Sequence, residues 1–284
     1  GDVNKDGVDD VVVGARTADV SGTDSGITYV LFGRARSNGV SASYANVNLS
    51  TLATAGTVQG FAIIGVPGDY SGYSVSAAGD VNKDGIGDVI IGAPTADTQG
   101  RVNAGVSYVV FGRNSASGAA AYTNIAAGNF VAAGSPLGFA IVGGTLDVNS
   151  GLSVSGAGDV NGDGFDDVII GAPLHDGAAQ SNIGAAYVIF GHSSATPFPN
   201  IDLLSFVPGP VGFKIQGLGP NDQCGNSVSR AGDVNGDGLM DVIVGAPYQA
   251  KSLTIVTSGF AYVIFGRVNG TDIDLFYFTS GASS

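Results

Sequence analysis

The sequence predicts an all-β fold in which four-stranded antiparallel blades repeat around an axis, which is a β-propeller. Two observations lead to this prediction. An aspartate-rich nonamer occurs four times in the 284 residues, at spacings of 78, 79 and 74 residues. Between these copies, apolar runs of four to six residues are bounded by glycine, serine, asparagine or proline, a pattern typical of short strands.

Each repeat holds up to four strand-like segments in a fixed order. The first precedes the nonamer, at 73–76, 152–155 and 226–229, and the second follows it, at 11–14, 89–92, 168–171 and 242–245. The third ends in Phe-Gly, at 28–33, 107–112, 186–191 and 261–266, and the fourth starts with Gly-Phe, at 60–65, 138–143 and 212–217. A parallel β-solenoid is the alternative, but its repeats are usually much shorter.

These segments define the expected organisation. We interpret residues 1–284 as a single propeller unit with repeats at approximately 1–79, 80–158, 159–232 and 233–284. The first repeat lacks its first strand and the last repeat lacks its fourth, so the first and last blades are incomplete in sequence. Either the sequence is part of a longer repeat array, or the C-terminal residues 275–278 and a neighbouring molecule complete the open blade by adding a strand to its edge.

The nonamer has the pattern Asp-x-Asn-x-Asp-Gly-x-x-Asp. Side-chain oxygens at positions 1, 3, 5 and 9 and the backbone carbonyl at position 7 are ligands that Ca²⁺ prefers, whereas Mg²⁺ keeps its waters and fits less well. We therefore predict about four Ca²⁺ ions, one per repeat, rather than four metal-free turns. The predicted ligands are Asp2, Asn4, Asp6, Val8, Asp10, Asp80, Asn82, Asp84, Ile86, Asp88, Asp159, Asn161, Asp163, Phe165, Asp167, Asp233, Asn235, Asp237, Leu239 and Asp241.

The nonamers differ from EF-hand loops. An EF-hand needs a glutamate at position 12 and a helix on each side. Position 12 here is Val13, Ile91, Ile170 or Val244, inside a β-branched run that predicts a buried strand.

Charge and composition exclude several functional classes. The net charge is −13, all 24 acidic residues are aspartate, and twelve of them occupy ligand positions, so four Ca²⁺ would bring the charge to −5. The 11 basic residues form no patch, which argues against nucleic acid as a partner. No apolar run approaches the ~18 residues of a membrane span, so we expect no membrane insertion.

Cysteine content and the first residue add two expectations. Cys224 is the only cysteine, so an internal disulfide is impossible and calcium must stabilise the loops. Low-affinity calcium loops suit an extracellular setting. The sequence contains no signal peptide and no initiator methionine, so we expect that Gly1 is not the first residue of the gene product.

The Gly-Ala-Pro triplets at 92–94, 171–173 and 245–247, together with the nonamers and the Tyr-Val-x-Phe-Gly segments, resemble FG-GAP repeats. Such repeats build the propeller head of integrin α-subunits and recur in large secreted bacterial proteins. The resemblance implies calcium in the hairpin between first and second strands, on the lower face, with ligands at the upper face. The chain departs from the pattern at Arg16, where other repeats have proline, and in having four repeats rather than seven blades.

Two groups of segments outside the strands are ambiguous. The connectors at 34–59, 113–137 and 192–211 are expected to be surface loops without function, outside the repeat core; glycan attachment and packing against a neighbour are the alternatives.

Two series of aspartates recur on the expected upper face, and we favour turn capping over a ring of carboxylates that binds a cation. They are Asp69, Asp147 and Asp222, and Asp19, Asp97 and Asp176, with Ala250 breaking the second series.

No catalytic residues are predicted. His175 and His192 are expected to be ordinary loop residues and Cys224 an inert small side chain. The leading hypothesis is an extracellular, calcium-stabilised structural or adhesive module of a larger surface protein or self-assembling multimer. Its partners would be proteins or further copies that bind at open blade edges. The alternative is a carbohydrate-binding propeller using scattered aromatics such as Tyr70 and Tyr248, and the least favoured is an enzyme such as a polysaccharide lyase.

Overall fold

A computed structural model describes residues 1–34, 46–54, 59–114, 123–130, 134–146, 148–178, 180–193, 198–250 and 258–275. In these residues nearly all regular structure is β, as predicted, and the one α-helix, α1 (Leu49–Thr54), is short. None of the described helices is long and apolar enough to cross a membrane.

Four sheets correspond to the four repeats, and we call them blades 1 to 4. Blade 1 contains β1 (Val11–Ala15), β2 (Ile27–Leu31) and β3 (Gly60–Ile64). Blade 2 contains β4 (Ser74–Gly79), β5 (Asp88–Ala93), β6 (Val106–Val110) and β8 (Gly138–Val142). Blade 3 contains β9 (Ser153–Gly158), β10 (Asp167–Ala172), β11 (Ala185–Ile189) and β13 (Gly212–Gln216). Blade 4 contains β14 (Ser227–Gly232), β15 (Asp241–Ala246) and β16 (Phe260–Ile264).

All four strand types predicted from the sequence are present. Consecutive strands within each blade pair antiparallel, and the third and fourth strands keep the same register in blades 1 to 3. In the described residues, blade 1 has no strand before β1 and blade 4 has none after β16, as the sequence predicts for incomplete blades. The predicted propeller blades are therefore confirmed.

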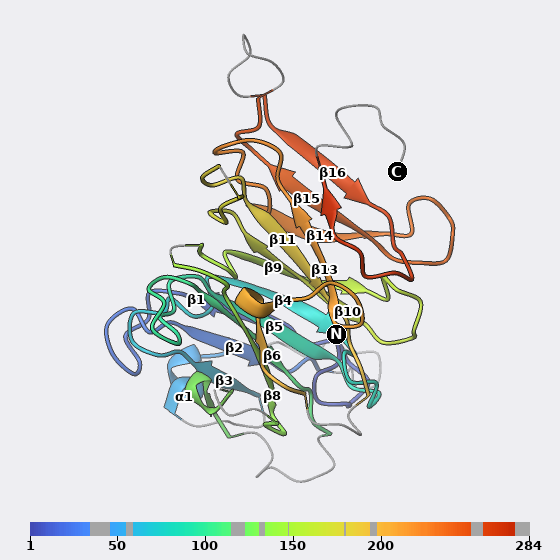
Figure 1. The fold of residues 1–284 in the computed structure, drawn as a ribbon. Helices are drawn as coiled ribbons and strands as arrows, with labels where there is room; N and C mark the ends of the chain where they lie inside the picture. Colours follow the sequence, from blue (N-terminus) through green and yellow to red (C-terminus); the bar gives the residue numbers. More distant parts are fainter. Residues whose placement is uncertain are drawn as a thin grey trace.

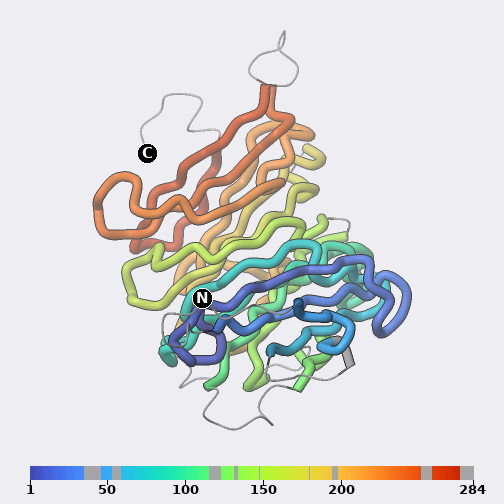
Figure 2. Tube along the Cα trace, turned by 180° about the vertical axis from the view of Figure 1, so that it is seen from behind, coloured from blue at the N-terminus to red at the C-terminus, as the bar shows by residue number. Residues whose placement is uncertain are grey.

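The blades lie one behind another in chain order, with blade 1 at one end of the molecule and blade 4 at the other (Figure 1). The view from behind shows the same separation between the blue first blade and the orange-red last blade (Figure 2). We call this row of blades the arc. Within it, the first strand of blade 3, β9, contacts the first strands of both neighbouring blades, β4 and β14.

The prediction that connectors are surface loops outside the core is wrong for their described parts. Two of the three connectors, and the segment after β16, each contribute a two-residue strand that reaches back and pairs parallel with the fourth strand of the preceding blade. We call these clasp strands: β7 (Ile125–Ala126) on β3, β12 (Ile201–Asp202) on β8 and β17 (Ile273–Asp274) on β13. Short 3₁₀ helices, η3 (Ala127–Phe130) and η4 (Leu203–Ser205), follow the first two.

One polar side chain before each clasp strand explains why the strand docks there. Asn124 Oδ1 accepts the N–H of Ala62 at 2.9 Å, and Asn200 Oδ1 accepts the N–H of Ala140 at 2.9 Å. Asp272 accepts the N–H of Lys214 in the same way at 2.6 Å. Each bond satisfies an edge-strand donor that the blade itself leaves unpaired.

The first residue of the C-terminal segment does not support the alternative in which this segment completes the open blade. Leu275 follows β17 and is fully buried between blades 3 and 4, so it extends a clasp and does not complete the open edge of blade 4. Residues 276–278 lie outside the described residues.

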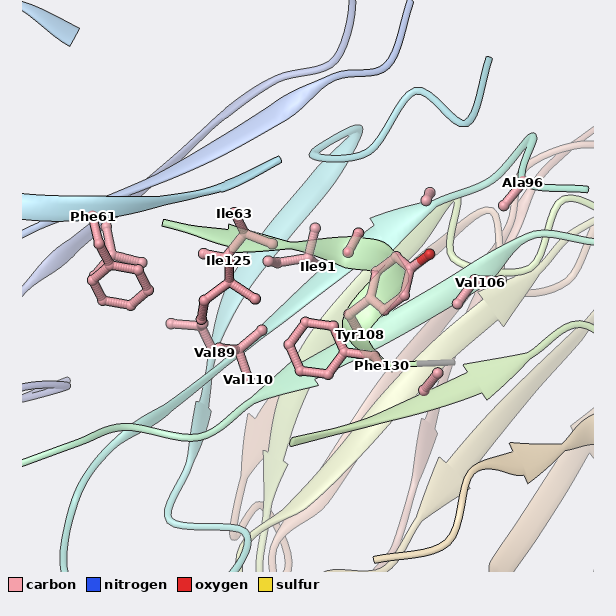
Figure 3. Packing of buried hydrophobic residues seen from close by; sticks show 14 of the residues in the cluster. Phe61, Ile63, Val89, Ile91, Ala96, Val106, Tyr108, Val110, Ile125 and Phe130 are labelled. Carbon is pink, nitrogen blue, oxygen red and sulfur yellow. The ribbon is translucent and has the colours of Figure 1, made fainter. Parts of the chain in front are cut away.

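The core consists of layers between successive blades rather than one central mass. Between blades 1 and 2, Phe61 and Ile63 of β3 pack with Val89 and Ile91 of β5 and with Ile125 of the clasp strand (Figure 3). Equivalent layers lie between blades 2 and 3 and between blades 3 and 4. Apolar burial therefore stabilises each blade only together with its neighbour.

The glycine near the end of the second strand of each blade explains how closely neighbouring blades approach. A Cβ on Gly14, Gly92 or Gly171 would collide with the carbonyl of Gly72, Gly151 or Gly225 in the following blade. Only glycine leaves room for this backbone contact. Gly245 of blade 4 meets no such carbonyl among the described residues.

Candidate metal centre

The four nonamers form loops at one end of the blades. We call them loop 1 (2–10), loop 2 (80–88), loop 3 (159–167) and loop 4 (233–241); loops 2 to 4 join the first and second strands of their blades. Glycine at position 6 has positive φ in every loop, from +80° to +90°, which is the left-handed turn that glycine was predicted to supply.

Backbone amides organise the oxygens of each loop. In loop 2, the carboxylate of Asp80 accepts the N–H groups of Asp84 at 3.0 Å and Gly85 at 2.8 Å. Asn82 Oδ1 also accepts the Asp84 N–H, and Asp84 Oδ1 accepts the N–H of Ile86. The other loops repeat this pattern, so the oxygens of positions 1, 3 and 5 face the inside of one turn.

The position 9 carboxylate is buried in loops 2 to 4 and half-buried at Asp10 of loop 1. Asp88 bridges the N–H of Val81 and the N–H of Gly112, both at 2.9 Å, and is 1% exposed. Asp167 and Asp241 make the equivalent bridges and are fully buried. Burial raises the pKa of both Asp88 and Asp167 to about 8, against the two backbone hydrogen bonds that lower it.

These observations test whether the residues fit a calcium ion. Asp88 and Asp167 are absent from the ion pairs of the described residues, so no side-chain cation compensates the charge that each carries when ionised. A divalent cation beside them would supply that compensation. The donor set fits Ca²⁺, although no cluster of three or more His, Cys, Asp or Glu side chains in the described part of the chain is gathered closely enough to hold a metal.

The predicted position 7 ligands, Val8, Ile86, Phe165 and Leu239, lie at the exit of the turn. Each donates its N–H to the position 5 aspartate of its own loop, at 2.9 to 3.0 Å. This contact holds the residue against the turn. All twenty predicted ligands thus lie in four short loops, and their binding of a metal ion stays a prediction.

Neighbouring loops are hydrogen-bonded to one another. The position 8 N–H of one loop donates to the position 1 carbonyl of the loop before it: Gly87 to Asp2, Asp166 to Asp80 and Met240 to Asp159. A second bond joins the residue after each Phe-Gly to the position 2 carbonyl of the preceding loop: Arg113 to Val3, His192 to Val81 and Arg267 to Val160. Ordering one loop therefore helps to order the next.

The aspartates of the upper face largely confirm the capping prediction. Asp19, Asp97 and Asp176 each accept a backbone N–H five or six residues later, and Asp222 accepts the N–H of Gly219. Asp147 lies outside the described residues. Asp69 is different, because burial and the nearby Asp97 raise its pKa to about 7.

The single cysteine and the two histidines show no catalytic arrangement. Cys224 is fully buried, and burial raises the pKa of its thiol to about 12, which leaves it protonated. His192 stacks on Phe198 with ring centroids 3.6 Å apart, and His175 packs edge-on against Tyr187.

Sequence reasoning missed the clasp residues Asn124, Asn200 and Asp272. A signal was present, because each is followed by isoleucine, and Asn124 and Asn200 precede the next fourth strand by a similar distance. The irregular connectors around them concealed this short repeat.

Comparisons with known proteins agree with this architecture. Residues 1–31, 71–110, 150–189 and 225–264 match the FG-GAP repeat family, which is more than half of the chain. These segments contain the four loops and the strands that flank them.

Several relatives are integrin subunits. The chain is 33% identical to integrin alpha-PS5 of Drosophila melanogaster over 63% of its residues, and 29% identical to integrin alpha-5 of Xenopus laevis over 72%. It is 32% identical to phosphatidylinositol-glycan-specific phospholipase D of Bos taurus over 39%. The match spans only 13% to 16% of the length of these relatives. With four matching segments on four successive blades, the chain belongs to the FG-GAP repeat family.

Proposed function

We propose that residues 1–284 act as one calcium-stabilised β-propeller unit that serves as a structural or adhesive module in an extracellular setting. The observation that carries the calcium proposal is the buried position 9 carboxylate, which has two backbone donors and no side-chain cation among the described ion pairs. One Ca²⁺ in each loop would neutralise three carboxylates that otherwise repel one another.

Calcium would act on the whole arc, because the loops are hydrogen-bonded in series. An ion that rigidifies loop 2 also fixes the carbonyl to which loop 3 donates. Binding to the folded state alone raises the free energy of unfolding by mass action. We therefore expect one cooperative stabilisation rather than four local ones.

Melting temperatures measured with calcium in the millimolar range and with EDTA test this proposal. Saturating calcium is expected to raise the melting temperature by about 10 °C or more, since several sites at ~100-fold excess over Kd each add about 2.7 kcal/mol. Titration calorimetry should count about four ions for the parent chain. An identical melting curve in EDTA and calcium would refute the proposal.

A matched pair of variants locates the ions. Asp163→Ala removes a position 5 ligand whose side chain is exposed, so it should lose one ion while melting almost like the parent in EDTA. Asp9→Ala changes a position 8 carboxylate that is 89% exposed and not a predicted ligand, and should keep all four ions. Equal calcium counts in the two variants would contradict the ligand assignment.

The adhesive or structural role is proposed from the relatives and from the open edges. Proteins named integrin alpha share these repeats, which supports protein partners at a cell surface or outside cells. In the described residues, β16 pairs with β15 on one side only, so its free edge can accept a strand from a partner or a further copy. The phospholipase D relatives match only 39% to 41% of this chain, and we propose no catalytic activity.

A glycan is the second candidate ligand. A cavity of about 200 Å³ lies between blades 2 and 3, lined by Tyr187, Phe206, His175, Lys214 and Asp272 among others. Aromatic rings beside hydrogen-bonding groups are the mixture that sugar sites use. A monosaccharide titration that gave heat with the parent and none with Phe206→Ala would support this candidate, and equal heats would exclude the cavity.

A further inference from the structure

Two lysines connect successive loops through contacts that the calcium ligands do not make. Lys5 and Lys83 are exposed, and both occupy position 4 of their loops, which is not a predicted ligand position. Lys5 Nζ donates to the backbone carbonyl of Asp84, the position 5 residue of loop 2, at 3.4 Å. Lys83 Nζ lies 5.0 Å from the ring centroid of Phe165, the position 7 residue of loop 3. Each lysine therefore reaches from its own loop to the turn of the next loop.

The two ammonium groups lie in equivalent places. A Cβ built on the position 6 glycine of the following loop would lie 3.2 Å from Lys5 Nζ at Gly85, and 2.6 Å from Lys83 Nζ at Gly164. Position 6 is the glycine at which the chain of each loop turns. The same contact between a lysine and the next turn thus occurs twice, once at loop 2 and once at loop 3.

The contact between loop 3 and loop 4 has no lysine. Position 4 of loop 3 is Gly162, where a Cβ would lie 2.8 Å from Cδ2 of Leu239, the position 7 residue of loop 4. An apolar side chain therefore lies against position 4 at this contact. Loop 4 has the same four types of side-chain ligand as loops 2 and 3 but receives no ammonium group from the loop before it.

The backbone at position 4 is less favourable for lysine than for glycine. The φ angle is +59° at Lys5 and +57° at Lys83, in the left-handed region, and +78° at Gly162. Glycine adopts such angles without the steric cost that a Cβ adds. Strain at a residue that makes a specific contact is a reason to infer a function for its side chain.

We propose that Lys5 and Lys83 lower the calcium affinity of the following loops, loops 2 and 3, by holding a positive charge beside the turn. This inference concerns the regulation of the proposed calcium sites and rests on the proposed function. Neither lysine takes part in an ion pair among the described residues, so no carboxylate contact neutralises its charge. A unit charge and a divalent ion ~10 Å apart in water repel enough to weaken binding by about fourfold.

The same charges stabilise the loops when calcium is absent. The carboxylates of one loop repel one another, and a nearby ammonium group offsets part of that repulsion. Lys5 and Lys83 therefore favour the calcium-free state of loops 2 and 3 over the calcium-bound state. The sites of one chain are then filled at different calcium concentrations.

A calcium titration followed by NMR at individual loops tests the proposal on the whole chain. Labelling with ¹⁵N-phenylalanine and ¹⁵N-leucine gives a reporter in loop 3 and one in loop 4, because the N–H of Phe165 donates to Asp163 and that of Leu239 to Asp237. In chelator-buffered calcium, Lys83→Gln should lower the half-saturating concentration of loop 3 by about threefold or more and change that of loop 4 much less. Lys83→Arg keeps the charge and should behave like the parent.

Two controls separate the charge of Lys83 from its packing. Arg16→Gln removes an exposed charge that follows β1, at the end of blade 1 away from the loops, and should leave both half-saturating concentrations unchanged. Potassium chloride at high concentration should reduce the effect of Lys83→Gln, because salt screens exposed charges. An effect of equal size at low and high salt would overturn the electrostatic assignment.

Labelling with ¹⁵N-isoleucine adds a reporter in loop 2, because the N–H of Ile86 donates to Asp84. A larger response to Lys83→Gln at loop 2 than at loop 3 would mean that Lys83 acts on its own loop, which contradicts the proposal.

The titration also separates this inference from the calcium proposal. A parent chain without any calcium-dependent change at Phe165 and Leu239 would overturn both. Calcium-dependent changes with the same half-saturating concentration in the parent and in Lys83→Gln would overturn the lysine inference alone and leave the calcium-stabilised module intact.

Discussion

The two inner blades and the two end blades have almost the same sequence pattern but differ in burial. Every residue of β5 and β10 is buried, whereas β15 of blade 4 alternates between buried and half-buried residues and β1 of blade 1 has two exposed residues. The strands pair in the same register in all four blades. The difference shows that side-chain burial in this fold belongs to the interface between two blades and not to the blade itself.

The largest expected effect compares one position in both environments. Phe190→Ala should destabilise the chain by about 3–5 kcal/mol, because it empties a packed site between blades 3 and 4. Phe265→Ala at the equivalent position of blade 4 should cost less than about 1.5 kcal/mol, since half of the side chain is exposed. Urea unfolding of the two variants and the parent measures both losses.

Equal losses at the two positions would mean that blade 4 is stabilised independently of a neighbour. That outcome would break the comparison, because burial would then be a property of each blade.

The next effect concerns the clasp strands. Asn200→Ala removes the acceptor of the Ala140 N–H and the donor to the Phe130 carbonyl, and should cost about 1–3 kcal/mol. Asn46 stands in the equivalent place in repeat 1, before Val47, and has no hydrogen-bond partner among the residues that the structure describes. Asn46→Ala should therefore change the melting temperature by less than a degree or two.

Thermal melts of Asn200→Ala and Asn46→Ala check this prediction, and each variant serves as the control for the other. A large loss from Asn46→Ala would show that the connector of repeat 1 is stabilised by contacts beyond a clasp.

The smallest effect is a pH dependence. Asp69 has a pKa of about 7 in the folded chain, raised by burial and by Asp97, but near 3.8 when unfolded. The folded state therefore holds a proton that the unfolded state releases, and raising the pH from 6 to 8 should lower the free energy of unfolding by about 1 kcal/mol. Saturating calcium keeps the proposed loop carboxylates ionised during this measurement.

The comparison between blades predicts which substitution removes the dependence of the free energy of unfolding on pH. Asp69→Asn should flatten the stability profile between pH 6 and 8. Asp222→Asn in blade 4 should flatten it less, because the Gly219 N–H opposes the rise in the pKa of Asp222. A profile that is unchanged in Asp69→Asn would assign the dependence to another group.

Short-range patterns made much of the fold predictable. The loops and the strands that flank them are determined by residues within nine positions of one another, such as glycine at position 6 and aspartate at position 9. The fixed period of the repeats predicted which strands pair, and the structure shows this pairing. The clasp was not predictable in this way, because Asn200 and Ala140 are 60 residues apart and the connector between them has irregular length. The predicted calcium ligands share four compact loops, and the presence of the ion stays a prediction.

The exposure of Val234 illustrates the other limit. Its sequence context matches that of Val81 and Val160, so no local pattern separates an exposed valine from a buried one. Only the number of blades and their order in space decide which position 2 valine is covered.

The clasp strands bear on how chains of this type change their length. Repeats 2 to 4 each carry both their own blade and the strand that secures the blade before it, so duplicating one such repeat would duplicate a complete joining device. A gene that gained or lost one such repeat would produce a protein in which the remaining interfaces between blades are unchanged. Arrays with different numbers of blades are therefore accessible in single genetic steps, without intermediates that must evolve a new contact.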